Sequence, residues 1–216
     1  MNLEQMSDFF TARVDGYDEQ MINNVQGCKA GYIKMAELLP QAADKILDLG
    51  CGTGLELDEI FKVKPDIDVT GIDLTQAMLD KLKEKHPDKN LTLINLSYFD
   101  YDFGAEKYDT AISFQTMHHF SHEEKQKLYL KIFKSLKDNG QYIESDYMVE
   151  TQEEEDFYFN ENKRIRKEQG IPDDEFYHYD TPCTIHNQIK LLTKAGFKSV
   201  TMKFREGNTT IIVAEK

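Results

Sequence analysis

The stretch Lys45-Ile46-Leu47-Asp48-Leu49-Gly50-Cys51-Gly52-Thr53-Gly54 decides the fold of this chain. Residues 45–49 form a short apolar run typical of a buried strand, and a helical pattern follows the glycines. Glycine permits backbone angles that a side chain forbids, and it lets a ligand approach the main chain closely. Open α/β sheets bind their ligands at the carboxyl ends of the strands. The stretch therefore predicts a ligand site at the tip of the first strand of an α/β sheet.

The residues around this turn alternate short β-type runs with helical segments. This is the pattern of an open, mostly parallel sheet with helices on both faces. The predicted strands are 45–49, 67–72, 91–96, 108–114 and 140–145, and the predicted helices between them are 55–61, 75–86 and 121–137. Lys137-Asp138-Asn139-Gly140 supplies a stop and a turn after the last of these helices.

The C-terminal part departs from this alternation. A predicted helix over 185–195 leads through Gly196 into strands over 197–204 and 209–214, which should form an antiparallel hairpin through Glu206-Gly207-Asn208. Segments 3–39 and 152–179 lie outside the sheet pattern and are expected to cover the site. We expect one domain in four parts, namely an N-terminal helical cover (1–40), a cofactor-binding core (41–150), an insert or lid (151–182), and a C-terminal helix and hairpin (183–216).

The charge and composition of the chain limit the partners and the cell compartment that we expect for it. The formal net charge of -13 repels phosphate backbones and anionic lipid, so neither nucleic acid nor membrane is an expected partner. No apolar run approaches the roughly 20 residues that span a bilayer, and the N-terminal residues lack the pattern of a secretory signal. The three cysteines are widely spaced and odd in number, which predicts reduced thiols. A cytoplasmic enzyme is the simplest interpretation.

Three glycines alone are a weak signal, and a dinucleotide site is the main rival. The dinucleotide-binding fingerprint, Gly-x-Gly-x-x-Gly, has a small residue at its last position, where this chain has Leu55. No Gly-Lys-Ser/Thr follows the turn to hold a nucleoside triphosphate. Asp73 ends the second predicted strand, where a carboxylate can accept hydrogen bonds from both ribose hydroxyls and would repel a 2′-phosphate. An unphosphorylated ribose is therefore implied, although Asp73 could also cap the following helix.

At these residues the chain resembles the class I S-adenosylmethionine-dependent methyltransferases, in which an acidic residue precedes Gly-x-Gly-x-Gly after the first strand and a second acid follows the second strand. The resemblance extends from about Asp44 to the C-terminus. It implies a Rossmann-like, seven-stranded, mostly parallel sheet whose final strand is antiparallel, with S-adenosyl-L-methionine as cofactor.

The resemblance also implies where the cofactor binds. The turn and Asp48 would hold the methionine end, Asp73 the ribose, and Leu74 with Met78 the adenine. The full set of expected cofactor-binding residues is Tyr17, Asp48, Gly50, Cys51, Gly52, Gly54, Asp73, Leu74, Met78, Ser97, Tyr98, Phe114 and Gln115.

Two of these positions carry open alternatives. Ser97 stands where many relatives have an Asp that binds the adenine amino group, so either Ser97 or Asp100 serves there. Residues 9–18 resemble the opening helix of small-molecule methyltransferases, in which Tyr17 either touches the methionine end or packs the helix onto the domain. The Cys51 side chain is expected to pack within the turn.

His118 and His119 are the candidate catalytic residues, because they follow the fourth predicted strand and an alcohol, phenol or protonated amine would need a base. Either could instead cap a helix or pack beneath the loop. His118, His119 and His122 could also be read as metal ligands, but no carboxylate or Cys stands at a fixed spacing from them. We therefore expect no metal.

The expected function is methyl transfer to a small-molecule acceptor enclosed by the two covering segments. The acceptor is not specified, because specificity lies in those segments. The aromatic residues of the insert could form an acceptor pocket or a homodimer surface. A regulatory or assembly protein that binds the cofactor without catalysis is the alternative from another class, and methylation of RNA or protein ranks below the small-molecule reading.

Overall fold

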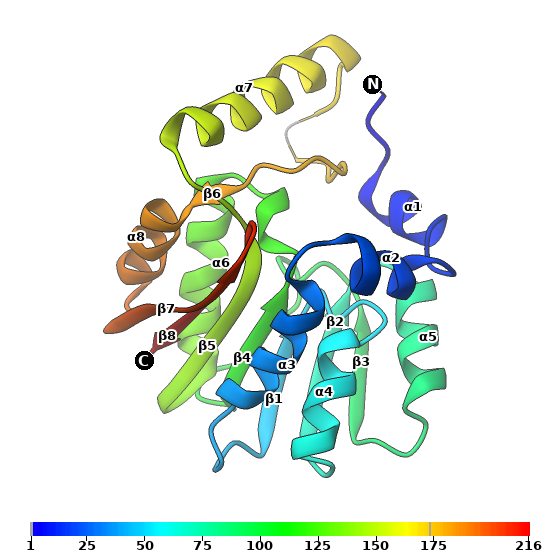
Figure 1. The fold of residues 1–216 in the computed structure, drawn as a ribbon, viewed down its shortest axis with the longest axis vertical. Coiled ribbons are helices and arrows are strands. Elements are labelled where there is room, and N and C mark those ends of the chain that lie inside the picture. The colour runs from blue at the N-terminus through cyan, green and yellow to red at the C-terminus, as the bar shows by residue number, and fades with distance from the viewer. Residues whose placement is uncertain (1, 173) are drawn as a thin grey trace.

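The computed structural model describes residues 2–172 and 174–216. Its centre is a mixed sheet with strand order β3-β2-β1-β4-β5-β8-β7, and a short eighth strand, β6, pairs with β5 (Figure 1). The strands are β1 (Lys45–Leu49), β2 (Asp68–Asp73), β3 (Leu91–Asn95), β4 (Tyr108–Phe114), β5 (Leu136–Val149), β6 (Cys183–Thr184), β7 (Ser199–Glu206) and β8 (Thr209–Glu215). Only β8 runs against its neighbours, which confirms the expected mostly parallel sheet with its antiparallel hairpin.

The site is positioned by a reversal of strand order at β1. This strand pairs in parallel with β2 on one side and with β4 on the other, so the chain builds outward from it in both directions. Such a reversal opens a crevice at the carboxyl ends of the two strands, because the connections that follow them diverge to opposite faces. The glycine turn after β1 lies at this crevice.

Helices cover both faces of the sheet and enclose two apolar clusters. One face carries α3 (Cys28–Leu38), α4 (Leu55–Val63) and α5 (Gln76–Lys85). The other carries α6 (His122–Ser135) and α8 (Ile185–Ala195), which pack against each other. The predicted helices are confirmed, and local chemistry explains their limits: Ser121 and Glu124 form a capping box at α6, while Gly196 ends α8 with a φ of 116°.

The boundary between α6 and β5 differs from the prediction. The helix ends at Ser135, and β5 begins at once with Leu136 instead of at Gly140. The predicted turn is an irregularity inside the strand, where Asn139 has a φ of 62° and the register against β4 shifts between Tyr108 and Thr110. Asn tolerates this left-handed conformation, so the strand bulges without ending.

The two covering segments meet above the sheet. The N-terminal part forms α1 (Met6–Thr11) and α2 (Tyr17–Asn24), so the expected opening helix over 9–18 is interrupted by a turn. The insert forms α7 (Gln152–Gln169) and a loop whose backbone pairs with the N-terminal segment, through Met6 N–H to Phe176 O at 3.0 Å and His178 N–H to Glu4 O at 2.9 Å. Figure 1 shows α7 above the sheet and α1 across from it. None of the described helices has the length and apolarity that a membrane span requires.

Candidate active site

The three glycines of the turn serve three different purposes. Gly50 N–H donates to the Ile72 carbonyl at 2.8 Å, and a Cβ on Gly50 would lie 2.7 Å from Thr116 Oγ1. Gly52 faces open space, with Tyr17 as its nearest side chain at 3.9 Å. A Cβ on Gly54 would lie 2.3 Å from Leu82 Cδ1 in α5. All three have positive φ, so the turn needs glycine for its angles, and of the three only Gly52 has room for a Cβ.

Asp73 is anchored at the tip of β2. Its Oδ2 accepts from Gly52 N–H at 2.9 Å and its Oδ1 accepts from Thr75 N–H at 2.8 Å. A carboxylate has about four acceptor positions, so two remain for the hydroxyls of a ribose. Burial raises the pKa of Asp73 to about 6, although the two backbone donors oppose that rise. The residue thus fixes the turn before α5 without capping that helix, whose N-cap is Thr75, and it lines a cavity.

Asp48 is fully buried beneath the turn, and the sequence pattern missed its partner, Glu56. In the described parts of the chain no donor reaches either Asp48 oxygen or Glu56 Oε1, apart from a proton that the two carboxyl groups can share. Burial, and then the neighbouring Glu56, raise the pKa of Asp48 well above its usual range, and burial raises that of Glu56 to about 7. Buried acceptors without donors favour a cationic ligand, and an ammonium group meets that requirement.

A narrow cavity joins most of the predicted cofactor residues. Its lining includes all of them except Asp48, Cys51 and Gly54. Cys51 is buried, and its sulfur would lie 2.9 Å from a Cβ on Gly71, so its side chain packs in the core as expected and offers no ligand contact. The predicted contacts are Tyr17, Gly50, Gly52, Asp73, Leu74, Met78, Ser97, Tyr98, Phe114 and Gln115.

Ser97 and several aromatic side chains line the part of this cavity in which the adenine contact is predicted. Ser97 lines it, whereas Asp100 is exposed and lies outside the lining, which favours Ser97 between the two alternatives. Tyr98 is buried and its hydroxyl lies 3.0 Å from Thr116 Oγ1. Phe176 completes the apolar wall and comes from the insert, 122 residues after Gly54, so no sequence spacing pointed to it.

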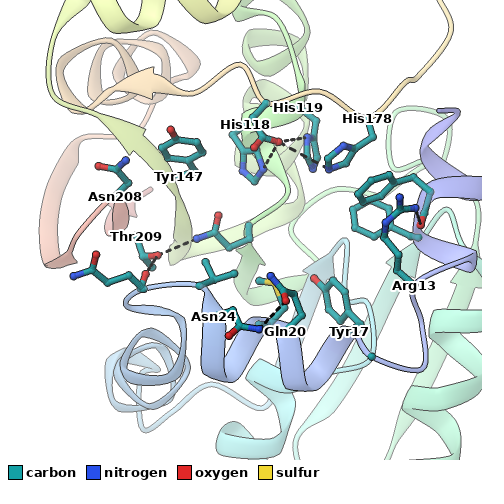
Figure 2. Close-up of a pocket in the computed structure, with 18 of the residues that line it drawn as sticks. Arg13, Tyr17, Gln20, Asn24, His118, His119, Tyr147, His178, Asn208 and Thr209 are labelled. Atoms are coloured by element: carbon teal, nitrogen blue, oxygen red, sulfur yellow. Dashed lines mark hydrogen bonds and ion pairs between the residues drawn. The ribbon is translucent and has the colours of Figure 1, made fainter. Parts of the chain in front are cut away.

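A second cavity of about 990 Å³ opens beside the first (Figure 2). It lies between the N-terminal helices, the loop after β4, the insert loop and the β7–β8 hairpin. Four residues line both cavities: Phe10, Tyr17, Gln115 and His119. The burial of Tyr17 raises the pKa of its hydroxyl above its usual range, so this side chain is a neutral wall between two ligand positions. From the insert loop, His178 and Asp180 line the larger cavity and Phe176 lines the narrow one, so an acceptor pocket formed by the aromatic residues of the insert stays a prediction.

His118 and His119 stand side by side in the wall of the larger cavity. His118 Nδ1 lies 2.6 Å from Oδ1 of buried Asp146, and its Nε2 lies 3.5 Å from Asp180 Oδ1. His119 Nδ1 lies 3.5 Å from the same Asp180 oxygen. Burial opposes charge on both rings, but Asp146 and Asp180 outweigh it at His118 and raise its pKa to about 10. The pKa of His119 falls well below its usual range, because burial and then the charge of His118 disfavour a second cation.

Comparisons with known proteins agree with this arrangement. Residues 46–140 match a family model described as a methyltransferase domain. The chain is 29% identical over 196 residues to a carboxy-S-adenosyl-L-methionine synthase of Nautilia profundicola, covering 80% of this chain and 77% of that protein. It is 25% identical to the protein of the same name in Campylobacter lari, covering 99% of this chain and 96% of that one.

Solved structures support the fold. A human N-acetylserotonin methyltransferase in complex with SAM superposes with a TM-score of 0.66 at 15% identity, covering 96% of this chain. This chain spans 55% of that structure's length. Streptomyces venezuelae DesVI superposes with a TM-score of 0.67 at 17% identity, covering 94% of this chain and 97% of that one.

Proposed function

The chain belongs to the class I S-adenosylmethionine-dependent methyltransferases, and from that premise we propose that it transfers a methyl group to a small molecule held in the larger cavity. The observation that carries this proposal is that the two cavities adjoin each other. The narrow one is lined by most of the residues predicted to bind the adenosyl group, and Phe10, Tyr17, Gln115 and His119 line both it and the 990 Å³ space. A donor in one and an acceptor in the other would meet at that junction.

The residues present fit S-adenosylmethionine. Asp73 has two acceptor positions for the ribose hydroxyls, and Asp48 with Glu56 offers buried oxygens that the ammonium group would reach through water, because neither residue lines the cavity. Leu74, Met78 and the aromatic residues nearby form the apolar seat for adenine. When bound, the cofactor supplies a methyl group that is already activated on a positively charged sulfur.

The chain's own residues then have two tasks, which are alignment and the exclusion of water. Gln115 is held at the junction with a φ of 52°, and its Nε2 donates to Thr209 Oγ1 at 3.1 Å. Residues in such a conformation persist only where the surroundings fix them, and they concentrate at functional sites. Tyr17 and Phe10 close the same junction from the N-terminal side. The catalytic role of His118 and His119 stays a prediction.

The relatives suggest a second candidate. Their printed name describes a product made on the cofactor itself, and this chain aligns with them over most of its length. The larger cavity contains Arg13 and three histidines, a lining that suits a reactant bearing a carboxylate. Carboxylation of the cofactor is therefore the alternative to methyl transfer, and product analysis distinguishes the two.

Calorimetry with S-adenosylhomocysteine tests the shared premise. We expect micromolar binding by the wild type, a loss of at least about tenfold in Asp73→Ala because two acceptor positions disappear, and no change in Asp80→Ala, an exposed acid on the same side of the fold. No detectable binding by the wild type would contradict the assignment.

Mass spectrometry of turnover mixtures tests the reaction. Incubation with S-adenosylmethionine and a panel of phenol, amine, thiol and carboxylate acceptors should give S-adenosylhomocysteine together with a methylated acceptor. A nucleoside heavier by one carboxyl group would favour the second candidate. A protein that binds S-adenosylhomocysteine but gives neither product with any acceptor would favour the regulatory alternative.

A further inference from the structure

We propose that His118, His119 and Asp180 bind a divalent transition-metal ion in the wall of the larger cavity, with His178 as a fourth ligand. The existence of this site goes beyond the proposed function and does not depend on it. The expectation of no metal rested on the lack of a carboxylate at fixed spacing. The fold supplies that carboxylate from the insert loop, 61 residues after His119.

The distances among the ligand atoms favour a metal over hydrogen bonds. Asp180 Oδ1 lies 3.5 Å from His118 Nε2 and 3.5 Å from His119 Nδ1, and these three atoms all lie within 4.8 Å of one another. Hydrogen bonds of this type are about 2.7–3.2 Å long. Two ligand atoms each about 2.1 Å from one ion, at a tetrahedral angle, are separated by about 3.4 Å. The observed spacing is that of ligands around an ion.

The His118 ring is oriented as metal ligands commonly are. Its Nδ1 is bound to the carboxylate of Asp146 at 2.6 Å, and this carboxylate is itself 1% exposed. A buried carboxylate on one ring nitrogen fixes the tautomer and directs the other nitrogen, here Nε2, toward the cavity. The sequence offered no signal for Asp146, which lies on β5.

The backbone holds Asp180 beside the histidines. Both the N–H and the hydroxyl of Thr181 donate to the His118 carbonyl, at 2.6 and 2.9 Å. His119 Nδ1 donates to the Tyr179 carbonyl at 3.3 Å, so an ion that binds at this nitrogen must displace its proton, and the neutral ring then carries its proton on Nε2. The insert loop is thereby fixed against the loop after β4, as a preformed site requires.

His178 lies on the same loop, next to this group of three but outside it, and would have to move toward the ion to become its fourth ligand. Its ring stacks on Phe9 with centroids 3.5 Å apart and an angle of 6° between the planes, and its Nε2 lies 4.0 Å from Asp180 Oδ1. Figure 2 shows His118, His119 and His178 pointing toward one another at the edge of the cavity. His178 N–H donates to the Glu4 carbonyl, so the N-terminal cover also helps to position this ligand.

The ligand set selects the class of ion. Imidazole and carboxylate suit Zn²⁺, Fe²⁺ and related first-row ions, whereas Mg²⁺ and Ca²⁺ prefer oxygen ligands alone. A second group of possible ligands, His122, Glu155 and Cys183, is already engaged in contacts within the protein. His122 Nε2 lies 2.8 Å from Glu155 Oε1, and Lys125 Nζ lies 3.3 Å from Cys183 Sγ, so a cation already occupies the place beside the thiol. This group supplies a matched control.

The ion would face the acceptor. It would lower the pKa of a hydroxyl or thiol that approaches it from the cavity, and the two histidines would then act as ligands instead of bases. This role rests on the proposed function, whereas the binding of the ion does not.

Titration of the chelator-stripped protein tests the site. We expect about one equivalent of Zn²⁺ to bind in calorimetry, and Co²⁺ to give a visible absorption band from the same site. Asp180→Ala and His119→Ala should weaken Zn²⁺ binding by at least about tenfold, and Asp146→Asn by about 10–100-fold because it orients a ligand. His122→Ala should bind as the wild type does, and Mg²⁺ should give no response.

Several outcomes would overturn the site: no Zn²⁺ binding by the wild type, unchanged binding by Asp180→Ala, or an equal loss in His122→Ala. Binding of S-adenosylhomocysteine by Asp180→Ala, measured in parallel, shows that this variant is folded. A protein that retains S-adenosylhomocysteine but not Zn²⁺ would remove the metal site and leave the cofactor assignment standing.

Discussion

We expect cofactor binding to depend on pH through Asp73. Its carboxylate must be ionised to accept two ribose hydroxyls in addition to its two backbone donors, and its pKa in the free protein is about 6. A proton therefore competes with the ligand below that pH, so we expect affinity for S-adenosylhomocysteine to rise by up to about tenfold per pH unit toward pH 6 and to flatten above pH 7. Calorimetry between pH 5 and 8 measures this profile.

The control for this profile is Asp73→Asn, which cannot lose a proton in the same range. This variant should bind S-adenosylhomocysteine more weakly, and its affinity should change less with pH. The pH dependence that is left would arise from Glu56, whose pKa is about 7. A wild-type affinity that is constant or falls with rising pH would contradict the assigned role of Asp73.

Gly54 tests packing separately from backbone angle. Alanine at this position would meet both a φ of 77° and Leu82 Cδ1 at 2.3 Å, whereas alanine at Gly104 meets a φ of 75° with only Lys107 Cδ at 3.7 Å. The left-handed angle costs about 1–2 kcal/mol, and overpacking adds about 1–3 kcal/mol. Urea denaturation should therefore show a larger loss in the free energy of unfolding for Gly54→Ala than for Gly104→Ala. Equal losses would show that Leu82 moves aside freely.

At the residue scale, sequence reasoning found what lies close in the chain. Asp48, Gly52 and Asp73 follow from a strand, a turn and the next strand, so their positions could be predicted from a short motif. Asp146 and Asp180 could not, because they approach His118 only through the packing of β5 and the insert loop. The three glycines looked alike in sequence, yet their different neighbours give them different roles.

At the element scale, hydrophobic patterning predicted the central strands and helices, while the covering segments were left undivided. The core helices bury an apolar face, which leaves a periodic signal. In α7 only Glu155 and Ile165 are buried, so little periodicity exists to be read. The start of β5 was not predicted because Asn139 and Gly140 are typical of a turn. In the structure they form a bulge inside β5, which continues to pair with β4.

The two capping boxes should respond differently to the same substitution. Ser121 caps α6, which packs into the core, whereas Thr151 caps α7, which packs lightly above the sheet. We expect Ser121→Ala to lower the global free energy of unfolding by about 0.5–2 kcal/mol. Thr151→Ala should leave the denaturation midpoint unchanged and instead speed amide exchange within α7 by about 2–30-fold, because local opening of that helix does not require global unfolding. A shifted midpoint in Thr151→Ala would show that the cover unfolds with the core.

The whole molecule carries a formal net charge of -13, which disfavours a polyanion as the methyl acceptor. Such a charge opposes approach to a polyanion, and the effect is largest when little salt screens it. We expect no mobility shift of transfer RNA at micromolar protein, even at about 20 mM salt, where electrostatic binding is strongest. Salt-sensitive micromolar binding would contradict the small-molecule interpretation and point to a local basic surface.

Ligand binding should stabilise the molecule as one unit, because the cofactor residues come from the N-terminal cover, four strand ends and the insert. Phe10, Asp73, Phe114 and Phe176 line one cavity although they lie in different parts of the chain. At 100 times its Kd, a ligand specific for the native state adds about 2.7 kcal/mol. For a chain of this length that corresponds to a rise in Tm of about 5–11 °C. Scanning calorimetry with S-adenosylhomocysteine should show this rise as a single sharpened transition, and Asp73→Ala should lose it. Two unfolding transitions, of which the ligand shifts only one, would mean that the cover and the core unfold separately. Ligand binding in the cavity would then not couple the two parts.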